Sequence, residues 1–396
     1  MKNKIELLAP AGDLERLKTA LRYGADAVYI GGPLLNLRAN AINFSMDELK
    51  EAITYAHNLK KKVYVTVNII LHNKELLEVD NYLKELSKMN VDAIIISDPS
   101  IIEIAKKYHI DIHLSTQQST LNYEAVEFWK KQGVSRVVLG RECTKEDIKL
   151  IKEKVDIEIE TFIHGAMCAG YSGRCVMSNV LTNRDANRGG CSQICRWDFE
   201  LLNSQFQEIK GNKPFTFCAK DLSMLKHIPE MINMGISSLK IEGRMRSQYY
   251  IATVVSVYRK IIDSFYQHIE IEEYNKYEQI LRNCANRDSI VQFFDGNYDS
   301  SCSYYNGREE LSNQDFLGIV LDYDKESKLA TIEQRNFFKK GDIVEAFGPD
   351  YIYSFQIKEI YDEDNNLLDV VRHPKQIVKI KVDCQLYSED MLRIKK

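Results

Sequence analysis

The chain has 396 residues and a formal net charge of −4, with 44% hydrophobic and 28% charged residues. This balance is ordinary for a globular protein, and it excludes a uniformly basic nucleic-acid-binding chain but not a local basic patch. The first residues do not resemble a signal peptide, and no apolar run is long enough to span a membrane. We therefore expect a cytoplasmic protein that contacts no membrane and keeps its thiols reduced.

Eight short runs rich in valine and isoleucine alternate with helical patterns along the chain. The runs are residues 5–9, 25–30, 63–70, 91–97, 110–115, 134–140, 157–163 and 236–241. Eight repeats of strand and helix predict an α/β fold, a (β/α)₈ TIM-like barrel. A doubly wound open sheet is the competing interpretation, and the count of eight favours the barrel.

The connection between the seventh and eighth runs is abnormally long, at roughly 70 residues, since such connections usually need a few loop residues and one helix. In a barrel it would lie on the C-terminal face, where active sites are built. We predict a barrel domain over residues 1–265 that includes a cysteine-rich insertion at 164–220. A helical connector over 266–312 follows, and period-two alternation predicts a small antiparallel β-barrel over 313–396.

Four cysteines of this insertion, Cys168, Cys175, Cys191 and Cys195, have the spacing C-x₆-C-x₁₅-C-x₃-C. They could ligate an iron–sulfur cluster, hold a zinc ion, or be structural thiols without a ligand. The irregular spacing and the aromatic neighbours that could shield a redox centre favour the cluster. Cys218, at the end of the same insertion, is an alternative fourth ligand.

Long motifs surround these cysteines: residues 160–178 (ETFIHGAMCAGYSGRCVMS), residues 191–197 (CSQICRW) and residues 238–247 (SLKIEGRMRS). They resemble the signature stretches of the family named peptidase U32, the collagenase-like proteases, and the resemblance covers essentially the whole chain. Members include proteins described as collagenases and proteins that hydroxylate RNA. The length and layout are most similar to those of members that make 5-hydroxyuridine in tRNA.

The resemblance implies an iron–sulfur protein, with a [4Fe–4S] cluster, that is required for prephenate-dependent hydroxylation of the tRNA wobble uridine. It implies three partners. They are tRNA, a small carboxylate such as prephenate or a related molecule, and a paralogous U32 subunit. The alternatives are a collagenase-like peptidase and a non-catalytic iron–sulfur subunit of a hydroxylase complex. The sequence contains no H-E-x-x-H and no G-x-S-x-G motif, which favours RNA chemistry over peptide hydrolysis.

Polar residues at the C-terminal ends of the predicted strands are the candidate catalytic residues, because a barrel builds its site there. They are Arg141, His164, Glu242 and Arg244, together with Glu160, which lies two positions earlier, inside its strand. The two arginines suit a carboxylate or a phosphate, which a guanidinium binds with two hydrogen bonds. The structural alternatives are salt bridges from the arginines to Glu142 and Glu242, and a buried ion pair between Glu160 and Lys240.

Overall fold

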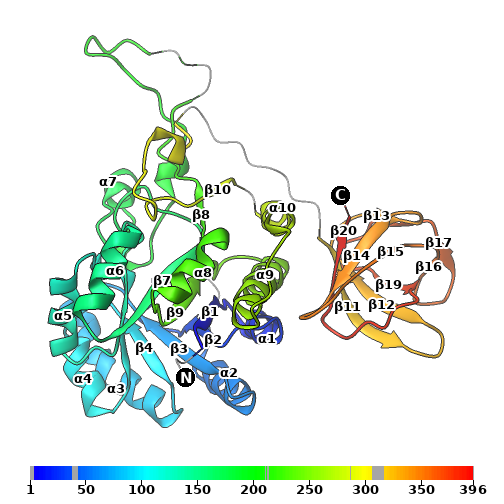
Figure 1. Ribbon diagram of the computed structural model, residues 1–396, viewed down its shortest axis with the longest axis horizontal. Helices are drawn as coiled ribbons and strands as arrows, with labels where there is room; N and C mark the ends of the chain where they lie inside the picture. Colours follow the sequence, from blue (N-terminus) through cyan, green and yellow to red (C-terminus); the bar gives the residue numbers. More distant parts are fainter. Residues whose placement is uncertain are drawn as a thin grey trace.

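The computed structural model describes residues 4–37, 43–209, 211, 214–285, 287–305 and 316–395. Its first part is a parallel barrel (Figure 1). The barrel strands are β1 (Glu6–Pro10), β2 (Ala27–Gly31), β3 (Lys62–Val67), β4 (Ala93–Ile96), β5 (Ile112–Leu114), β6 (Arg136–Val138), β7 (Glu158–Gly165) and β9 (Ser238–Ile241). β9 pairs with both β7 and β1 and closes the barrel. The predicted barrel is confirmed, and the open-sheet interpretation is wrong.

Helices cover the outside of the barrel (Figure 1). They are α1 (Leu14–Arg22), α2 (Met46–Asn58), α3 (Asn73–Lys88), α4 (Ile101–Lys107), α5 (Tyr123–Lys131), α6 (Lys145–Lys154), α8 (Ile228–Asn233) and α9 (Gln248–Tyr266). Capping boxes begin α2 at Ser45 and α6 at Thr144, where a side chain and a backbone N–H satisfy each other. Among the described helices, none is long and apolar enough to cross a membrane.

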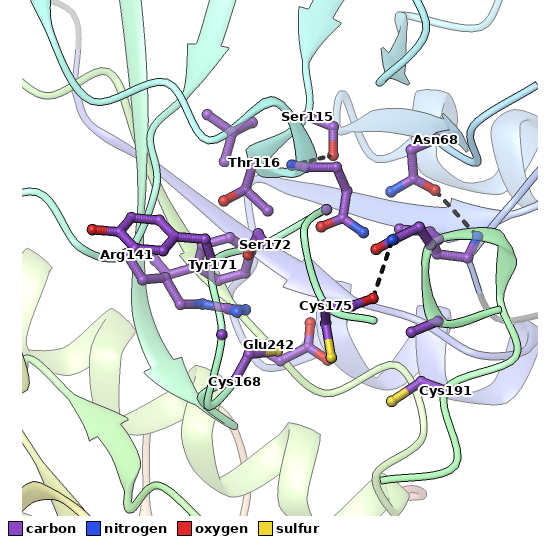
Figure 2. A pocket seen from close by; sticks show the side chains of 18 of the residues that line it. Asn68, Ser115, Thr116, Arg141, Cys168, Tyr171, Ser172, Cys175, Cys191 and Glu242 are labelled. Atoms are coloured by element: carbon purple, nitrogen blue, oxygen red, sulfur yellow. Dashed lines mark hydrogen bonds between the residues drawn. The ribbon is translucent and has the colours of Figure 1, made fainter. Parts of the chain in front are cut away.

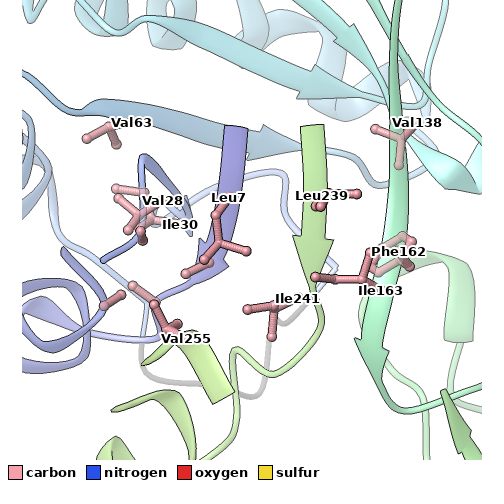
Figure 3. Packing of buried hydrophobic residues seen from close by; sticks show 14 of the residues in the cluster. Leu7, Val28, Ile30, Val63, Val138, Phe162, Ile163, Leu239, Ile241 and Val255 are labelled. Atoms are coloured by element: carbon pink, nitrogen blue, oxygen red, sulfur yellow. The ribbon is translucent and has the colours of Figure 1, made fainter. Parts of the chain in front are cut away.

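The main hydrophobic core lies between the strands and this outer layer of helices. Figure 3 shows outward-facing strand residues such as Leu7, Val28 and Ile241 meeting Val255 of α9. These four side chains are almost completely buried. Each full burial of such a side chain contributes about 1.5–3 kcal/mol, so this layer is the main source of the barrel's stability.

The interior of the barrel is a separate and partly charged layer. A small apolar cluster fills part of it, formed by Leu8, Ala27, Tyr29, Tyr64, Ala93 and Ile95. Beside it, Arg136 Nη1 lies 2.6 Å from Glu6 Oε1 and 3.2 Å from Glu160 Oε2. Lys240 Nζ lies 2.7 Å from Glu160 Oε1, so the ion pair expected inside the barrel is present. Buried charges are tolerated when they pair in this way.

The insertion between β7 and β9 has little regular structure. It contains α7 (Met177–Thr182) and β8 (Asp221–Ser223), which pairs with the end of β7 in antiparallel fashion. An arm held by the bridges Phe199–Phe215 and Leu202–Glu208 projects away from the barrel (Figure 1). Several large apolar side chains of this arm face solvent.

After the barrel come α10 (Tyr274–Cys284) and β10 (Ser289–Ile290), which pairs with β8. The C-terminal domain is an antiparallel half-barrel, as predicted for this region. Its main strands are β11 (Phe316–Asp324), β12 (Leu329–Gln334), β14 (Ile343–Phe347), β15 (Ile352–Gln356), β16 (Ile360–Tyr361), β17 (Leu367–Leu368), β19 (Ile377–Lys381) and β20 (Met391–Ile394). A separate pair is formed by β13 (Phe338–Lys339) and β18 (Val370–Val371). The predicted boundary between residues 312 and 313 lies outside the described residues, so the domain limits stay a prediction.

Candidate functional site

A cavity of about 180 Å³ lies at the carboxyl ends of the barrel strands, beneath the insertion (Figure 2). The barrel contributes polar side chains from strand ends that are far apart in the sequence. These are Tyr29, Thr66, Asn68, Arg141, Lys240, Glu242 and Arg244, with Phe162 among them. The insertion covers the other side. The predicted position of the site, at the C-terminal face beside the cysteine-rich insertion, is therefore where the structure forms a cavity.

Cys168, Cys175, Cys191 and Cys195 all line this cavity, whereas Cys218 is buried and is not among its described lining residues. Figure 2 shows the first three on one side of it. Burial, and next the neighbouring Cys168 thiol, raise the pKa of Cys195 to about 11. A bound metal would reverse this preference for the thiol, since a ligating cysteine is deprotonated.

The donor set matches the chemistry of an iron–sulfur cluster, which takes four cysteine ligands. Among the described residues, no three Cys, His, Asp or Glu side chains are gathered closely enough to hold one metal ion. A cluster spreads its ligands over several iron atoms, so its cysteines stand farther apart than the ligands of a single ion. The four cysteines around one cavity are the kind of ligand that an iron–sulfur cluster takes.

Specific contacts fix the insertion on the mouth of the barrel. Gly173 has a φ of +76°, and a Cβ there would lie 2.1 Å from the backbone oxygen of Gln117, so only glycine allows this approach. Arg188 Nη2 lies 2.8 Å from Glu75 Oε1 of α3, and Arg188 Nη1 donates to the backbone oxygen of Ile70 at 2.6 Å. The Arg188 hydrogen bond lowers the pKa of Glu75 to about 2. The cysteines are thereby carried by a segment with defined anchors.

Arg244 is held at the cavity wall by neutral side chains. Its Nη1 donates to Thr66 Oγ1 at 2.9 Å, and its Nη2 donates to Asn36 Oδ1 at 2.9 Å and Asn43 Oδ1 at 3.2 Å. A Cβ on Gly31 would lie 2.6 Å from Arg244 Nη1, so the guanidinium packs directly on the glycine backbone. These three neutral acceptors help to fix the orientation of the guanidinium.

Arg141 rests on an aromatic ring. Its Cζ lies 3.8 Å from the centroid of the Phe162 ring, within the range of a cation–π interaction. The salt bridge to Glu142, the structural alternative for Arg141, is absent from the described residues, and Glu142 Oε2 is buried there with no hydrogen-bond partner. Burial raises the pKa of Glu142. The Phe162 ring thus supports the Arg141 guanidinium at the wall of the cavity.

The three remaining candidates have different surroundings. Glu242 lines the cavity, and its Oε2 accepts a hydrogen bond from the Tyr29 hydroxyl at 3.2 Å. Glu160 is completely buried behind Lys240 and is absent from the described cavity lining. His164 is also absent from that lining. Any catalytic roles of the three stay predictions.

A bulge explains the orientation of His164. The pairing of β7 with β9 shifts register between Phe162 and His164, which ends the alternation that directs Glu160 and Phe162 inward. His164 Nδ1 lies 3.2 Å from the Tyr258 hydroxyl of α9, outside the barrel. Burial lowers the pKa of His164 to about 3, so its imidazole is neutral at physiological pH.

The sequence analysis overlooked Tyr29 and Thr66 as cavity residues, and it treated Lys240 only as part of an ion pair. The period-two alternation of a strand could have identified the first two, since each lies one or two residues before the end of its strand. Tyr171, one of the aromatic neighbours of the cysteines in the sequence, also lines the cavity.

Comparisons with known proteins place the chain among named relatives. Residues 12–303 match the model of Peptidase family U32, and residues 312–393 match that of its C-terminal domain. The chain is 49% identical to tRNA hydroxylation protein P1 of Bacillus subtilis, over 98% of this chain and 94% of that protein. It is 34% identical to tRNA hydroxylation protein P of Haemophilus influenzae, over 92% and 90%. It is 32% identical to a collagenase of Porphyromonas gingivalis, over 75% and 74%.

Proposed function

This chain belongs to peptidase family U32, and we propose that within this family it is an iron–sulfur protein required for prephenate-dependent hydroxylation of the tRNA wobble uridine to 5-hydroxyuridine. The observation that carries the proposal is the shared cavity, where four cysteines of the insertion meet cationic residues of the barrel. The relatives named tRNA hydroxylation proteins support the choice of RNA and reaction.

In this proposal Cys168, Cys175, Cys191 and Cys195 hold a [4Fe–4S] cluster. The cluster supplies one-electron chemistry at the edge of the cavity. Arg141 and Arg244 bind the negatively charged groups of the substrates, since a guanidinium forms paired hydrogen bonds with a carboxylate or a phosphate. A zinc ion held by the same cysteines is the alternative cofactor, but no three Cys, His, Asp or Glu side chains of the described residues are gathered closely enough to hold one metal ion, which favours the cluster.

A peptidase is the second candidate, based on the family name and on the collagenase relative. A cysteine nucleophile needs a base within hydrogen-bond reach. No histidine is found among the described residues that line the cavity, and His164 packs against α9 instead. These observations favour RNA chemistry. In the third candidate, a non-catalytic subunit, the cluster is structural and the partner, such as a paralogous U32 protein, carries the reaction.

The test is nucleoside analysis of tRNA from a strain that lacks the gene, complemented with the wild type or with variants. We expect 5-hydroxyuridine to disappear on deletion and to return with the wild type and with Cys384→Ser, whose cysteine lies in the C-terminal domain. Cys168→Ser and Arg141→Ala should not restore it. Unchanged 5-hydroxyuridine in the deletion strain would refute the proposal. Activity retained by Arg141→Ala but lost by Cys168→Ser would favour the non-catalytic subunit.

A further inference from the structure

We propose that Lys240 binds a carboxylate of the small co-substrate at the floor of the cavity, and that Glu160 is the positioning residue behind it. This inference rests on the proposed function and adds a residue that touches substrate. Sequence reasoning placed Glu160 among the catalytic candidates. The contacts of the two side chains assign the role of touching substrate to Lys240, because of the two only Lys240 is in the described cavity lining.

Lys240 combines burial with access to the cavity. Its residue is 4% exposed, yet it is part of the cavity lining. Its Nζ donates to Glu160 Oε1 at 2.7 Å and lies 4.4 Å from the centroid of the Tyr29 ring. An ammonium has three N–H donors, and an aromatic face attracts its charge without replacing a strong acceptor. Lys240 therefore keeps donor capacity for an oxyanion.

Glu160 cannot make that contact itself. It is 0% exposed, and its two oxygens are divided between two cations, Oε1 with Lys240 and Oε2 with Arg136. Arg136 is fixed in turn by Glu6, whose Oε1 also accepts a hydrogen bond from Ser238 Oγ at 2.8 Å. This chain of alternating charges runs up the barrel interior and ends at the Lys240 ammonium. It holds the ammonium in place before substrate arrives.

Arg141 is a second cation, and both it and Lys240 lie near the ring of Phe162. Lys240 is paired with Phe162 in the register of β9 and β7, and its Nζ lies 5.6 Å from the centroid of that ring. Arg141, after β6, has its guanidinium 3.8 Å from the same centroid. Lys240 and Arg141 thus approach the Phe162 ring from the two strands that flank β7. Both cations therefore lie near one ring, and both charges attract an oxyanion bound there.

The cavity offers cationic side chains to an anion. Those described in its lining are Arg141, Lys240 and Arg244, beside one described carboxylate, Glu242, while Glu160 pairs with Lys240 from behind the lining. A carboxylate of a small molecule and an RNA phosphate share the oxyanion chemistry that would be bound. We favour the small molecule, because Lys240 is nearly buried at the floor of a cavity of only about 180 Å³.

The test measures binding, without turnover, by calorimetry with prephenate and by fluorescence anisotropy with labelled tRNA. The proteins are the wild type, Lys240→Met, Lys240→Arg and the control Lys152→Met. Lys152 donates to the backbone oxygen of Ile157, outside the cavity. We expect Lys240→Met to weaken prephenate binding at least about tenfold, as the loss of a charge-assisted hydrogen bond does. Lys240→Arg should recover part of this affinity, and Lys152→Met should bind like the wild type. Binding of tRNA should not change.

A double variant keeps the test valid if Lys240→Met fails to fold, because removing one partner of a buried ion pair is strongly destabilising. Lys240→Met combined with Glu160→Gln removes both charges. We expect this double variant to fold and to bind prephenate more weakly than the wild type, as Lys240→Met does. Glu160→Gln alone should also weaken prephenate binding, with less effect than Lys240→Met, because the ammonium remains.

Three results would overturn the inference: wild-type protein that binds neither ligand, Lys240 variants that bind prephenate as tightly as the wild type, or weaker binding of tRNA alone. The last result would assign Lys240 to an RNA phosphate. The proposed function fails separately. If prephenate binding depends on Lys240 but deletion of the gene leaves 5-hydroxyuridine unchanged, the anion site stands and the tRNA reaction does not.

Discussion

Gly31 controls the position of Arg244, although it carries no functional group itself. Its added Cβ would lie 2.6 Å from Arg244 Nη1. Gly31→Ala should therefore displace the guanidinium from Thr66 and Asn36. A displacement of about 1 Å at a site can reduce turnover about 100-fold, and we expect at least about a tenfold loss of tRNA hydroxylation. The measurement is 5-hydroxyuridine in tRNA of the complemented deletion strain.

The matched control for this prediction is Gly170→Ala, because a Cβ on Gly170 meets nothing within 4 Å. We expect this variant to remain active. Wild-type activity in Gly31→Ala would show that Arg244 does not need its present position.

His164 makes stability depend on pH. Its pKa is about 3 in the folded protein, lowered by burial, and about 6.5 for an unperturbed histidine. Between these values the unfolded chain binds a proton that the native protein does not. The contribution of His164 to the free energy of unfolding is therefore fully present above about pH 6.5 and is lost as pH falls towards 3. From pH 7.5 to 5.5 we expect a loss of about 1.4 kcal/mol from this group.

Urea unfolding at these two pH values checks the prediction. The free energy of unfolding of His164→Gln should fall less than that of the wild type, by about this amount. Equal pH dependence in both proteins would mean that the pKa of His164 is the same in the folded and unfolded states.

The rule that a barrel builds its site at the carboxyl ends of its strands predicted which residues converge. It failed where a bulge changes the direction of a side chain. Arg141, Glu242 and Arg244 reach one cavity because the carboxyl ends of parallel strands meet at one face. His164 also ends a strand, but a bulge turns it away, and such bulges have no reliable sequence signal. The order of Glu160 and Lys240 along the barrel axis depends on the stagger of the strands, which a strand pattern alone does not give.

At the scale of elements, the strands and capped helices were predictable because their patterns are local. The eight apolar runs, and caps such as Ser45 and Thr144, lie where the structure has strands and helix starts. The insertion is different, since it has no periodicity. Its shape depends on contacts between distant residues, such as Gly173 with Gln117 and Arg188 with Glu75, which only the folded chain reveals.

The Arg188 anchor leads to a prediction about the insertion. Arg188→Ala removes the ion pair with Glu75 and the hydrogen bond to Ile70. We expect faster amide hydrogen exchange in residues 176–195 and unchanged exchange in the barrel strands, because local opening requires fewer contacts to break. The control is Arg184→Ala, whose exposed side chain has no described ion pair. Unchanged exchange in Arg188→Ala would show that other contacts hold the insertion.

At the scale of the whole molecule, the C-terminal domain packs against the barrel through α1 and α9. The Tyr23 hydroxyl lies 3.1 Å from the backbone oxygens of both Phe347 and Glu389. Arg22 Nη2 lies 2.7 Å from Asp390 Oδ1, and the rings of Tyr249 and Phe316 stack at 4.7 Å. These contacts make one unit of the barrel and the half-barrel.

Tyr23→Phe should weaken this unit, because it removes the hydroxyl that lies within hydrogen-bond distance of the buried backbone oxygen of Phe347. Such a loss costs about 1–3 kcal/mol. We expect calorimetry to show a lower unfolding temperature for the C-terminal domain, separated from the barrel transition. A single unfolding transition at the wild-type temperature would show that the two parts do not depend on this contact.

We propose that the insertion cysteines form one iron–sulfur site at the mouth of the barrel. Its most direct test is the iron and sulfide content of protein purified without oxygen, for the wild type, Cys168→Ser and the control Cys384→Ser. We expect about four irons and four sulfides per chain in the wild type and the control, and their loss in Cys168→Ser. Zinc in place of iron, no metal in the wild type, or an intact cluster in Cys168→Ser would contradict it.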